Sequence, residues 1–565
     1  IINDVHVITG DYCEREADIS IKGTSPLNFT RTYYSGLAFG GAVDTGTLHG
    51  FWSHNHYGAV YLLAGRIADK FFTHKGGKVY NYHAYAFDSN ASTSFYERTP
   101  SKEPLSVMDF QLKYGVTNHS FFTPDAPNWK SQHLDVTESK NGKCFITDGK
   151  GGVKSFKKAG KYTHLLQEER LSSGNRISYE FKKYNDLLPK RVATYDKKNN
   201  TCINWMNFNF KSLNGSVSAG KWYVDVNASN GQFAKYSFSK ASGAVRMYHL
   251  MSVESSYLPK VEYEYNSKWR LTKRKLPHHR HKAIEYYSFK GEGNGYYNTT
   301  DFRMPIDSGK VKLLKAPVGS NNDLLTTDSF SYFCDPQMPN TGYSGRTEHI
   351  DALGNKTIYF FSTDHRLQKI EKYSHRDKEK PSLTECYHWG AAETHNESNL
   401  LCKTIKDSTG KIHATASYKY DGNGNLIEHA LWGDITGKRE GHIILKDGTP
   451  AKNCSDSITT KYTYNYDNLM ESKQKSNGKK TFFTYYPGTS LLKDSFVFFN
   501  NIQKTRTFYS YDSNGTSTET ISDNGSSRHK EDLHSVTERH IQRIVPSKEE
   551  ASRSLPKVKI GRAHV

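Results

Sequence analysis

Aromatic and polar residues alternate over short stretches of this chain, and each stretch ends in a turn rich in Asp, Asn and Gly. The clearest copy covers residues 418–426 and reads YKYDGNGNL. Because the side chains of a β-strand alternate between its two faces, Tyr418 and Tyr420 fall on the same face. Asp421 and Gly424 belong to a segment that tolerates the positive φ of a tight turn, and an apolar residue then restarts the strand. The pattern therefore predicts a β-hairpin.

Less regular copies of this pattern recur between about Gly174 and Gly515. We assign to the repeat Asp351 with Gly354, Tyr464 and Tyr466 with Asp467, and Tyr511 with Asp512 and Gly515. A single hairpin exposes an aromatic face that it cannot bury alone, so a series of hairpins is stabilised by packing on its neighbours. We therefore expect an all-β fold of spiralling antiparallel β-hairpin repeats, with these aromatic side chains stacked between neighbouring turns.

The composition agrees with a protein made of many short strands. The 38 Tyr, 29 Phe and 43 Gly against only 17 Pro are typical of strands joined by glycine-containing turns. An aromatic share of 13% excludes disorder as the main description of the chain. The most apolar run, residues 59–64, is far shorter than the roughly 20 residues of a transmembrane helix, so we expect no transmembrane segment. Only residues 527–542 show a helix-like pattern, and they are mostly polar.

The chain is basic, with 77 Lys and Arg against 58 Asp and Glu and a net charge of +19. These cations are scattered through strand-like segments, which favours a solvated basic surface over specific nucleic-acid binding. Whether these cations face outward only, or whether some of them line an interior, stays open. The 7 Cys lie far apart without a Cys-x-x-Cys pair, which argues against a disulfide framework and a structural zinc site.

The first sixty residues are less repetitive and carry an ordered series of short motifs. These are a Thr-Gly-x-Tyr turn, an Asp-hydrophobic-x-hydrophobic-x-Gly segment, a Pro-Leu-x-hydrophobic-x-Arg-x-Tyr segment and a Gly-x-Trp. Their defining residues, the head motif below, are Thr9, Gly10, Tyr12, Asp18, Gly23, Pro26, Leu27, Arg31, Tyr33 and Trp52. The ordered series resembles the signature at the head of the Rhs/YD-repeat family. An Asp-Gly hairpin over residues 146–156 is similar to the one that commonly follows it.

The resemblance covers roughly residues 3–525 and implies an architecture. It implies a β-rich head module over residues 1–115, a YD-repeat β-shell over 116–527 and a weakly structured tail over 528–565. In bacterial members the shell encloses a C-terminal toxin, and related shells occur in insecticidal toxin complexes and in animal teneurins. The resemblance therefore implies a non-catalytic shell fragment, secreted or at the bacterial cell surface, whose partner is a toxin cargo outside this chain.

The C-terminal part departs from the pattern of complete, toxin-bearing members. Those members end their shell with a self-cleaving aspartyl region and an Asp-Pro-x-Gly-Leu type boundary, whereas Asp335-Pro336 lies mid-chain without the Gly-Leu. We therefore expect no cleavage activity here, and the identity of the toxin stays open. Residues 560–565 (IGRAHV) match the translation of a common sequencing-adapter read, so we expect them to be foreign and the chain to be a fragment.

Candidate chemistry is sparse in this sequence. Histidines gather at residues 278–281, in an evident turn, and at His54 and His56, which would share one strand face. Metal sites usually add carboxylate or Cys ligands, and we assign no metal to either group. Residues 291–295 (GEGNG) look like a phosphate-binding loop but lack the helix that such a loop needs. With no Gly-x-Ser-x-Gly elbow and no Cys in a catalytic setting, we predict no catalytic, cofactor or metal site and no enzyme.

Two other functions remain open at this point. A cell-surface or wall-associated protein could bind carbohydrate or a surface receptor through exposed aromatic strands. A downstream gene pair for a toxin and a small immunity protein would favour delivery, and its absence would favour adhesion. An enzyme of the β-propeller or β-helix type is disfavoured, because the repeat spacing drifts and no acid pair stands out.

Overall fold

The computed structural model consists of β-strands joined by turns, with no helix in the residues that it describes. Those residues are 1–23, 25–35, 51–62, 73–75, 78–79, 84–88, 92–98, 107–117, 120–122, 133–137, 143–160, 163–181, 188–197, 200–212, 220–240, 248–277, 280–288, 309–318, 323–334, 345–362, 366–391, 394–397, 399–433, 457–545 and 557–563. Across these ranges, no helix is long and apolar enough to cross a membrane. The predicted all-β, antiparallel fold is confirmed.

The strands form one small head sheet, one two-stranded ribbon and one long sheet that we call the wall. The head sheet holds β1 (Cys13–Ile21), β2 (Leu27–Tyr34) and β3 (Trp52–His54), and the ribbon holds β5 (Thr73–Lys75) and β6 (Lys78–Val79). The wall holds β4 (Gly58–Leu62), β7 (Ala84–Asp88), β8 (Ser92–Arg98), β9 (Val107–Thr117), β10 (Ser120–Phe122), β11 (His133–Thr137), β12 (Lys143–Thr147), β13 (Val153–Lys158), β14 (Thr163–Arg170), β15 (Arg176–Glu180), β16 (Arg191–Tyr195), β17 (Cys202–Ser212), β18 (Lys221–Ala228), β19 (Phe233–Lys240), β20 (Tyr248–Ser255), β21 (Val261–Tyr265), β22 (Leu271–Lys275), β23 (His281–Tyr286), β24 (Val311–Val318), β25 (Asp323–Cys334), β26 (Gly345–Asp351), β27 (Lys356–Phe361), β28 (Leu367–Tyr373), β29 (Leu383–Trp389), β30 (Leu400–Asp407), β31 (Ile412–Tyr420), β32 (Leu426–Gly433), β33 (Ser457–Tyr464), β34 (Met470–Lys475), β35 (Lys479–Tyr485), β36 (Leu492–Phe499), β37 (Ile502–Tyr511), β38 (Ser517–Asp523), β39 (Arg539–Val545) and β40 (Lys557–Ala563).

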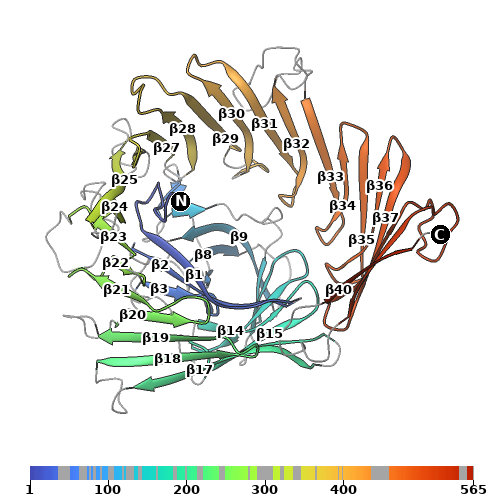
Figure 1. Cartoon of the computed structure of the whole chain (residues 1–565), viewed down its shortest axis with the longest axis horizontal. Helices are drawn as coiled ribbons and strands as arrows, with labels where there is room; N and C mark the ends of the chain where they lie inside the picture. The colour runs from blue at the N-terminus through green and yellow to red at the C-terminus, as the bar shows by residue number, and fades with distance from the viewer. Residues whose placement is uncertain are drawn as a thin grey trace.

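In the wall, nearly every strand pairs with the next one along the chain in antiparallel register. Strand β14 has two partners along one of its edges: its first residues pair with β4 and its last residues with β15. Strands β4, β7, β8, β9, β11, β12, β13 and β14 therefore close into a ring, and the wall continues from β15 to β40. Figure 1 shows this continuation curling around the head strands until its last strands return beside β14 and β15.

The returning part of the wall is hydrogen-bonded to its beginning through hairpin turns, along a line that we call the seam. The bonds are 2.6–2.8 Å long and join Asn468 to Gly149, Ser490 to Ser172 and Asn175 to Asn514. Asn175 is also bonded to Ser25 in the turn between β1 and β2, at 2.6 Å. Turns that are over 300 residues apart in sequence thus meet, and the curl closes on itself.

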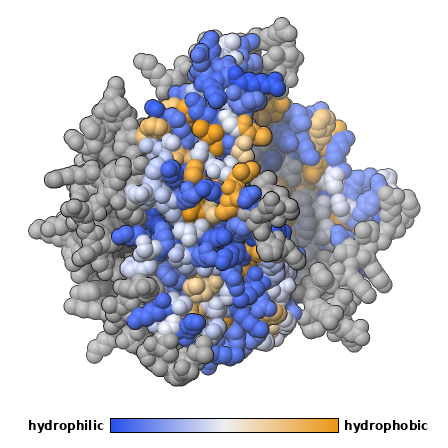
Figure 2. Space-filling view, turned by 60° about the vertical axis from the view of Figure 1, so that its left-hand side comes forward, coloured by the Kyte–Doolittle hydropathy of each residue, from blue (hydrophilic) through white to orange (hydrophobic). Residues whose placement is uncertain are grey.

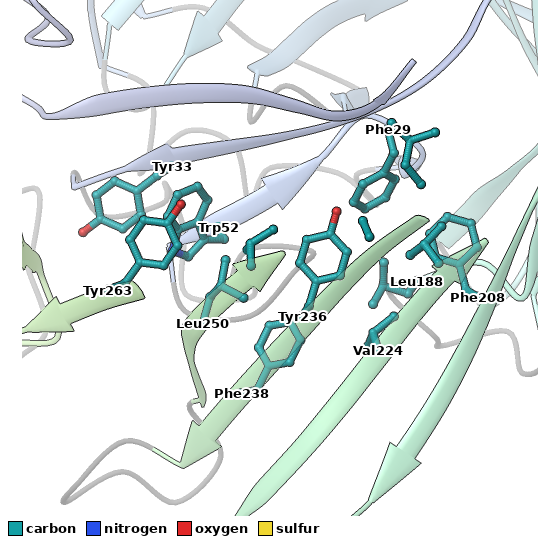
Figure 3. Packing of buried hydrophobic residues seen from close by; sticks show 14 of the residues in the cluster. Phe29, Tyr33, Trp52, Leu188, Phe208, Val224, Tyr236, Phe238, Leu250 and Tyr263 are labelled. Carbon is teal, nitrogen blue, oxygen red and sulfur yellow. The ribbon is translucent and has the colours of Figure 1, made fainter. Parts of the chain in front are cut away.

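The main core lies between the head sheet and the strands of the wall that face it. Figure 3 shows Phe29, Tyr33 and Trp52 of the head packed against wall residues that include Tyr236 and Tyr263. Strand β18 alternates buried and exposed residues along its length, because one of its faces meets the head and the other meets water. The side of the molecule in Figure 2 is mostly hydrophilic, with hydrophobic side chains scattered among the polar ones.

The helix-like pattern of residues 527–542 does not correspond to a helix. Residues 524–538 form bends and turns, and β39 follows them. The fully buried Arg506 donates its NH groups to the backbone carbonyls of Ser527, His529 and Asp532 at 2.6–2.8 Å. These carbonyls are therefore satisfied by a side chain and do not need the hydrogen bonds of a helix.

Candidate functional site

The centre of the head is a buried ion pair between two residues of the head motif. Asp18 lies at a β-bulge in β1, opposite β2, which carries Arg31. The guanidinium Nε of Arg31 donates to both carboxylate oxygens of Asp18, at 2.9 and 3.2 Å, and both side chains are fully buried. Burial raises the pKa of the Asp18 carboxyl, and the adjacent Arg31 charge opposes that shift.

The wall completes this ion pair from strands more than 200 residues away in sequence. Tyr236 on β19 donates its hydroxyl to Asp18 at 2.8 Å, and Arg31 donates to the hydroxyl of Tyr263 on β21 at 2.5 Å. The Arg31 guanidinium also lies 4.8 Å from the ring centroid of Trp52. Because a buried charge is costly unless it is paired and hydrogen-bonded, these wall residues fix where the head can dock.

The remaining head-motif residues surround the pair or form its turns. Tyr12 and Tyr33 are fully buried, and the Tyr33 hydroxyl accepts the backbone N–H of Leu271 at 2.8 Å. Gly10, at φ +74°, accepts the backbone N–H of Val311 at 2.8 Å and packs closely on the Lys310 side chain. Leu27 is buried, Thr9 accepts the backbone N–H of Asp11 at 3.4 Å, and Gly23 and Pro26 lie exposed in the turn between β1 and β2.

The imidazole rings of the head histidines pack against an aromatic ring of the core. His54 and His56 both stack on Phe29, with centroids 5.5 and 6.1 Å away, and the Nε2 of His56 is bonded to the carbonyl of Asn28. Burial lowers the pKa of His56 to about 4. In the described residues, no group of three or more His, Cys, Asp or Glu could hold a metal ion. His278, His279 and the loop 291–295 lie outside those residues.

The repeat turns of the wall share one geometry. The carboxylate of Asp421 accepts the backbone N–H groups of Asn423 and Asn425 at 2.9 and 2.8 Å, and Gly424 takes φ +82°. Glycine suits that position because a β-carbon is strained in left-handed backbone. The same geometry recurs at Asp351 with Gly354 and at Asp512 with Gly515.

In several hairpins, the tyrosine before the turn links that hairpin to the one before it. Tyr420, Tyr464 and Tyr485 each donate the hydroxyl to a carbonyl of the preceding hairpin, at 2.8–3.0 Å, and the acceptors are Leu400, Leu426 and Met470. Each acceptor residue is itself paired, across the preceding hairpin, with the aromatic residue that comes before the turn of that hairpin. Tyr265, Tyr286 and Tyr332 make the same bond to Leu250, Leu271 and Val311, and Trp389 makes it to Leu367 with its ring N–H. We call these bonds the ladder. The sequence pattern predicted Tyr420 and Tyr464 as repeat residues, but it did not predict the role of their hydroxyls or the other members of the ladder.

One predicted repeat is displaced by two positions. The turn after β33 begins at Asn465, which accepts the backbone N–H four residues on, and Asn468 takes the positive φ of +56°. Tyr464 with Asn465 therefore corresponds to the Tyr-Asp step. Tyr466 is 99% exposed, so the stacking predicted for it is wrong, and Asp467 lies inside the turn.

Among the other predicted stacking residues, Tyr418 and Tyr511 have close aromatic partners, whereas the contacts described for Tyr420 and Tyr464 are those of their hydroxyls. Tyr418 stacks on His429, with centroids 5.1 Å apart, but this is a partner within its own hairpin. Tyr511 meets Tyr486 of the neighbouring hairpin edge-on at 5.8 Å. Stacking therefore acts both within and between hairpins.

The face of the wall that touches the head, here called the inward face, can be followed strand by strand. Thr347 on β26 lies on it, because its hydroxyl donates to the carbonyl of Val7 in the head. Directly paired residues share a face, so the inward face continues through Tyr359, Ile370, Glu385, Ile405, Ala414, Ala416, Leu431 and Ile458, and through Tyr418, His429, Thr460 and Lys475. Lys419, Lys461 and Lys480 lie on the opposite face. Cations thus occupy both faces in the described part of the wall, and the distribution is not outward-only.

These features define an all-β protein whose antiparallel wall curls around its own N-terminal module. Residues 3–68 match the model of a family described as Domain of unknown function (DUF6531), and the head motif falls within that segment. The chain resembles the Rhs/YD-repeat proteins in this head and in its repeated Tyr-Asp turns. No curated protein matches the chain.

Several solved structures of Tc toxin proteins are similar to the chain. The Tc holotoxin pore of Photorhabdus luminescens shares 10% identity at a TM-score of 0.40, over 86% of this chain and 26% of that one. A TcdB2–TccC3–Cdc42 complex shares 10% identity at 0.36, over 86% and 27%. TcdB2–TccC3 without its hypervariable C-terminal region shares 9% at 0.28, over 97% and 27%. The chain thus spans about a quarter of their length, and the function proposed below rests on its own residues.

Proposed function

We propose that this chain is the wall and head of an enclosing shell in a toxin-delivery protein of the Rhs/YD-repeat kind, and that it catalyses no reaction. The observation that carries the proposal is the seam. Because the turn residues from 149 to 175 bond those from 468 to 514, the wall returns to its start and the inward face turns toward an interior. The proposed partner is a toxin polypeptide, and the proposed location is outside the bacterial cell or at its surface.

The character of the inward face supports an enclosed chain. Leu431 and Ile458 lie on it next to each other and are 42% and 46% exposed. Adjacent exposed apolar side chains are favourable contacts for an apolar stretch of polypeptide. An enclosed polypeptide would cover these side chains and remain shielded from proteases.

The experiment compares the access of reagents to the two faces. Leu431→Cys places a thiol on the inward face and Lys461→Cys places one on the opposite face, both in a Cys202→Ser background that removes an exposed native thiol. We expect a small maleimide to label both variants and a long PEG-maleimide to label only Lys461→Cys at full rate. Equal rates with the long reagent at both positions would contradict an enclosed interior.

A further inference from the structure

Three lysines meet on the inward face at the hairpin formed by β34 and β35. Lys473 is paired with Thr481, and Lys475 and Lys479 follow on the same face, since Gln474 and Lys480 pair on the other. Together with Thr481 they line a pocket. Lys475 and Lys479 are exposed, and Lys473 is half-buried.

These lysines differ from Lys372 and Lys403, two cations of the same face, in having no anionic partner. Lys372 and Lys403 are both bonded to the Glu385 carboxylate, at 2.9 and 2.7 Å, so one anion serves both cations. Within the described ranges, no carboxylate forms an ion pair with Lys473, Lys475 or Lys479. Three like charges on one hairpin repel one another, and an anionic ligand removes that repulsion.

The surroundings of the three lysines indicate which kind of anion fits. The Lys473 ammonium lies 5.7 Å from the ring of Tyr462, and the exposed Leu431 and Ile458 lie on the neighbouring strands of the same face. A surface of lysine, tyrosine and aliphatic side chains matches a peptide in which acidic and apolar residues are mixed. The arginines that give bidentate phosphate contacts are absent from the pocket lining.

From this arrangement we infer that the inward face of β32 to β35 is a binding surface for an acidic, extended segment of polypeptide, with Lys473, Lys475 and Lys479 as its anion contacts. The inference deepens the proposed function, because the enclosed chain would supply the segment. The wall would thereby prefer a cargo with acidic stretches. The acidic side chains of such a cargo would neutralise lysines of the inward face that otherwise repel one another.

The test uses a fluorescent short peptide of alternating Glu and Leu, its Lys-Leu counterpart and a short oligothymidylate, each titrated onto the full chain. The variant K473Q/K475Q/K479Q is compared with K419Q/K461Q/K480Q, which removes as many charges from the opposite face. We expect the acidic peptide to bind, to weaken with salt, and to lose about ten-fold in affinity only in the inward variant.

Three outcomes would overturn the inference: no binding of the acidic peptide, an equal loss in both triple variants, or tighter binding of oligothymidylate through the same lysines. Each leaves the reagent-access result at Leu431 and Lys461 unchanged. Conversely, an open interior in that experiment would contradict the enclosing function while peptide binding at the three lysines could still be measured.

Discussion

Arg31 is the residue whose replacement tests most directly how the head is held in the wall. Arg31→Met keeps a long side chain over Trp52 but removes the charge that neutralises Asp18. Glu14, which is also buried, lies 3.8 Å from Arg31 and loses part of its compensation as well. Removal of one partner of a buried ion pair costs about 3–5 kcal/mol, so we expect the head to be destabilised by that amount.

Two features of the expected loss follow from the geometry. Asp18→Asn combined with Arg31→Met should cost less than the sum of the single changes, by about 2 kcal/mol, because the double variant buries no uncompensated Asp18 charge. The penalty of Arg31→Met should also shrink as pH falls from 7 toward 4. Burial raises the pKa of Asp18, and once Arg31 no longer opposes that shift, protonation removes the stranded charge.

The assay is hydrogen exchange of the β1 and β2 amides in rising urea, which reports the free energy of opening the head. The control is Lys260→Met, which breaks the exposed ion pair of Lys260 with Glu262 at 2.7 Å and should cost less than about 1 kcal/mol. A loss of under about 1 kcal/mol for Arg31→Met, strictly additive single changes, or a penalty that does not depend on pH would refute the reasoning.

Three further results are expected. Tyr464→Phe removes a ladder hydrogen bond and should cost about 1 kcal/mol in urea unfolding, whereas Tyr466→Phe should be neutral; equal effects would contradict the displaced register. Burial lowers the pKa of His56 from 6.5 to about 4 in the folded chain, so stability should fall as pH drops through that window; His56→Phe should flatten the fall by up to about 3 kcal/mol, and an unchanged slope would count against it. Ser172→Cys with Ser490→Cys should form a disulfide on mild oxidation, seen as a gel shift, because their hydroxyls lie 2.8 Å apart; failure to oxidise would contradict the seam.

The local part of this fold can be predicted from the sequence because its cause is local. The turn at Asp421 depends on one carboxylate and one residue with positive φ, all within five positions. The pattern fails at Tyr466 because the aromatic-x-aromatic-Asp run at 464–467 overlaps the true one at 462–465, where Asn465 stands in place of Asp. Only the positive φ at Asn468 and the pairing of β33 with β34 decide between the two registers.

The long-range part of the fold has no local signal. The sequence shows Asp18 and Arg31 as motif residues, but nothing near them indicates Tyr236 or Tyr263 as their partners. The inward position of Lys473 likewise depends on a register carried across many strands. Such facts follow from the packing of the whole chain, and a composition of +19 cannot distinguish the two faces of a sheet.

The seam also determines the order in which parts of the wall can form during synthesis. Almost every pairing in the wall joins a strand to its immediate successor, so the wall can form in steps as the chain leaves the ribosome. The bonds to Gly149 and Ser172 must wait until residues 468 and 490 have been made, more than 300 positions later. Until then the inward face is open along that whole line, so the proposed cargo can enter before the last hairpins narrow the opening.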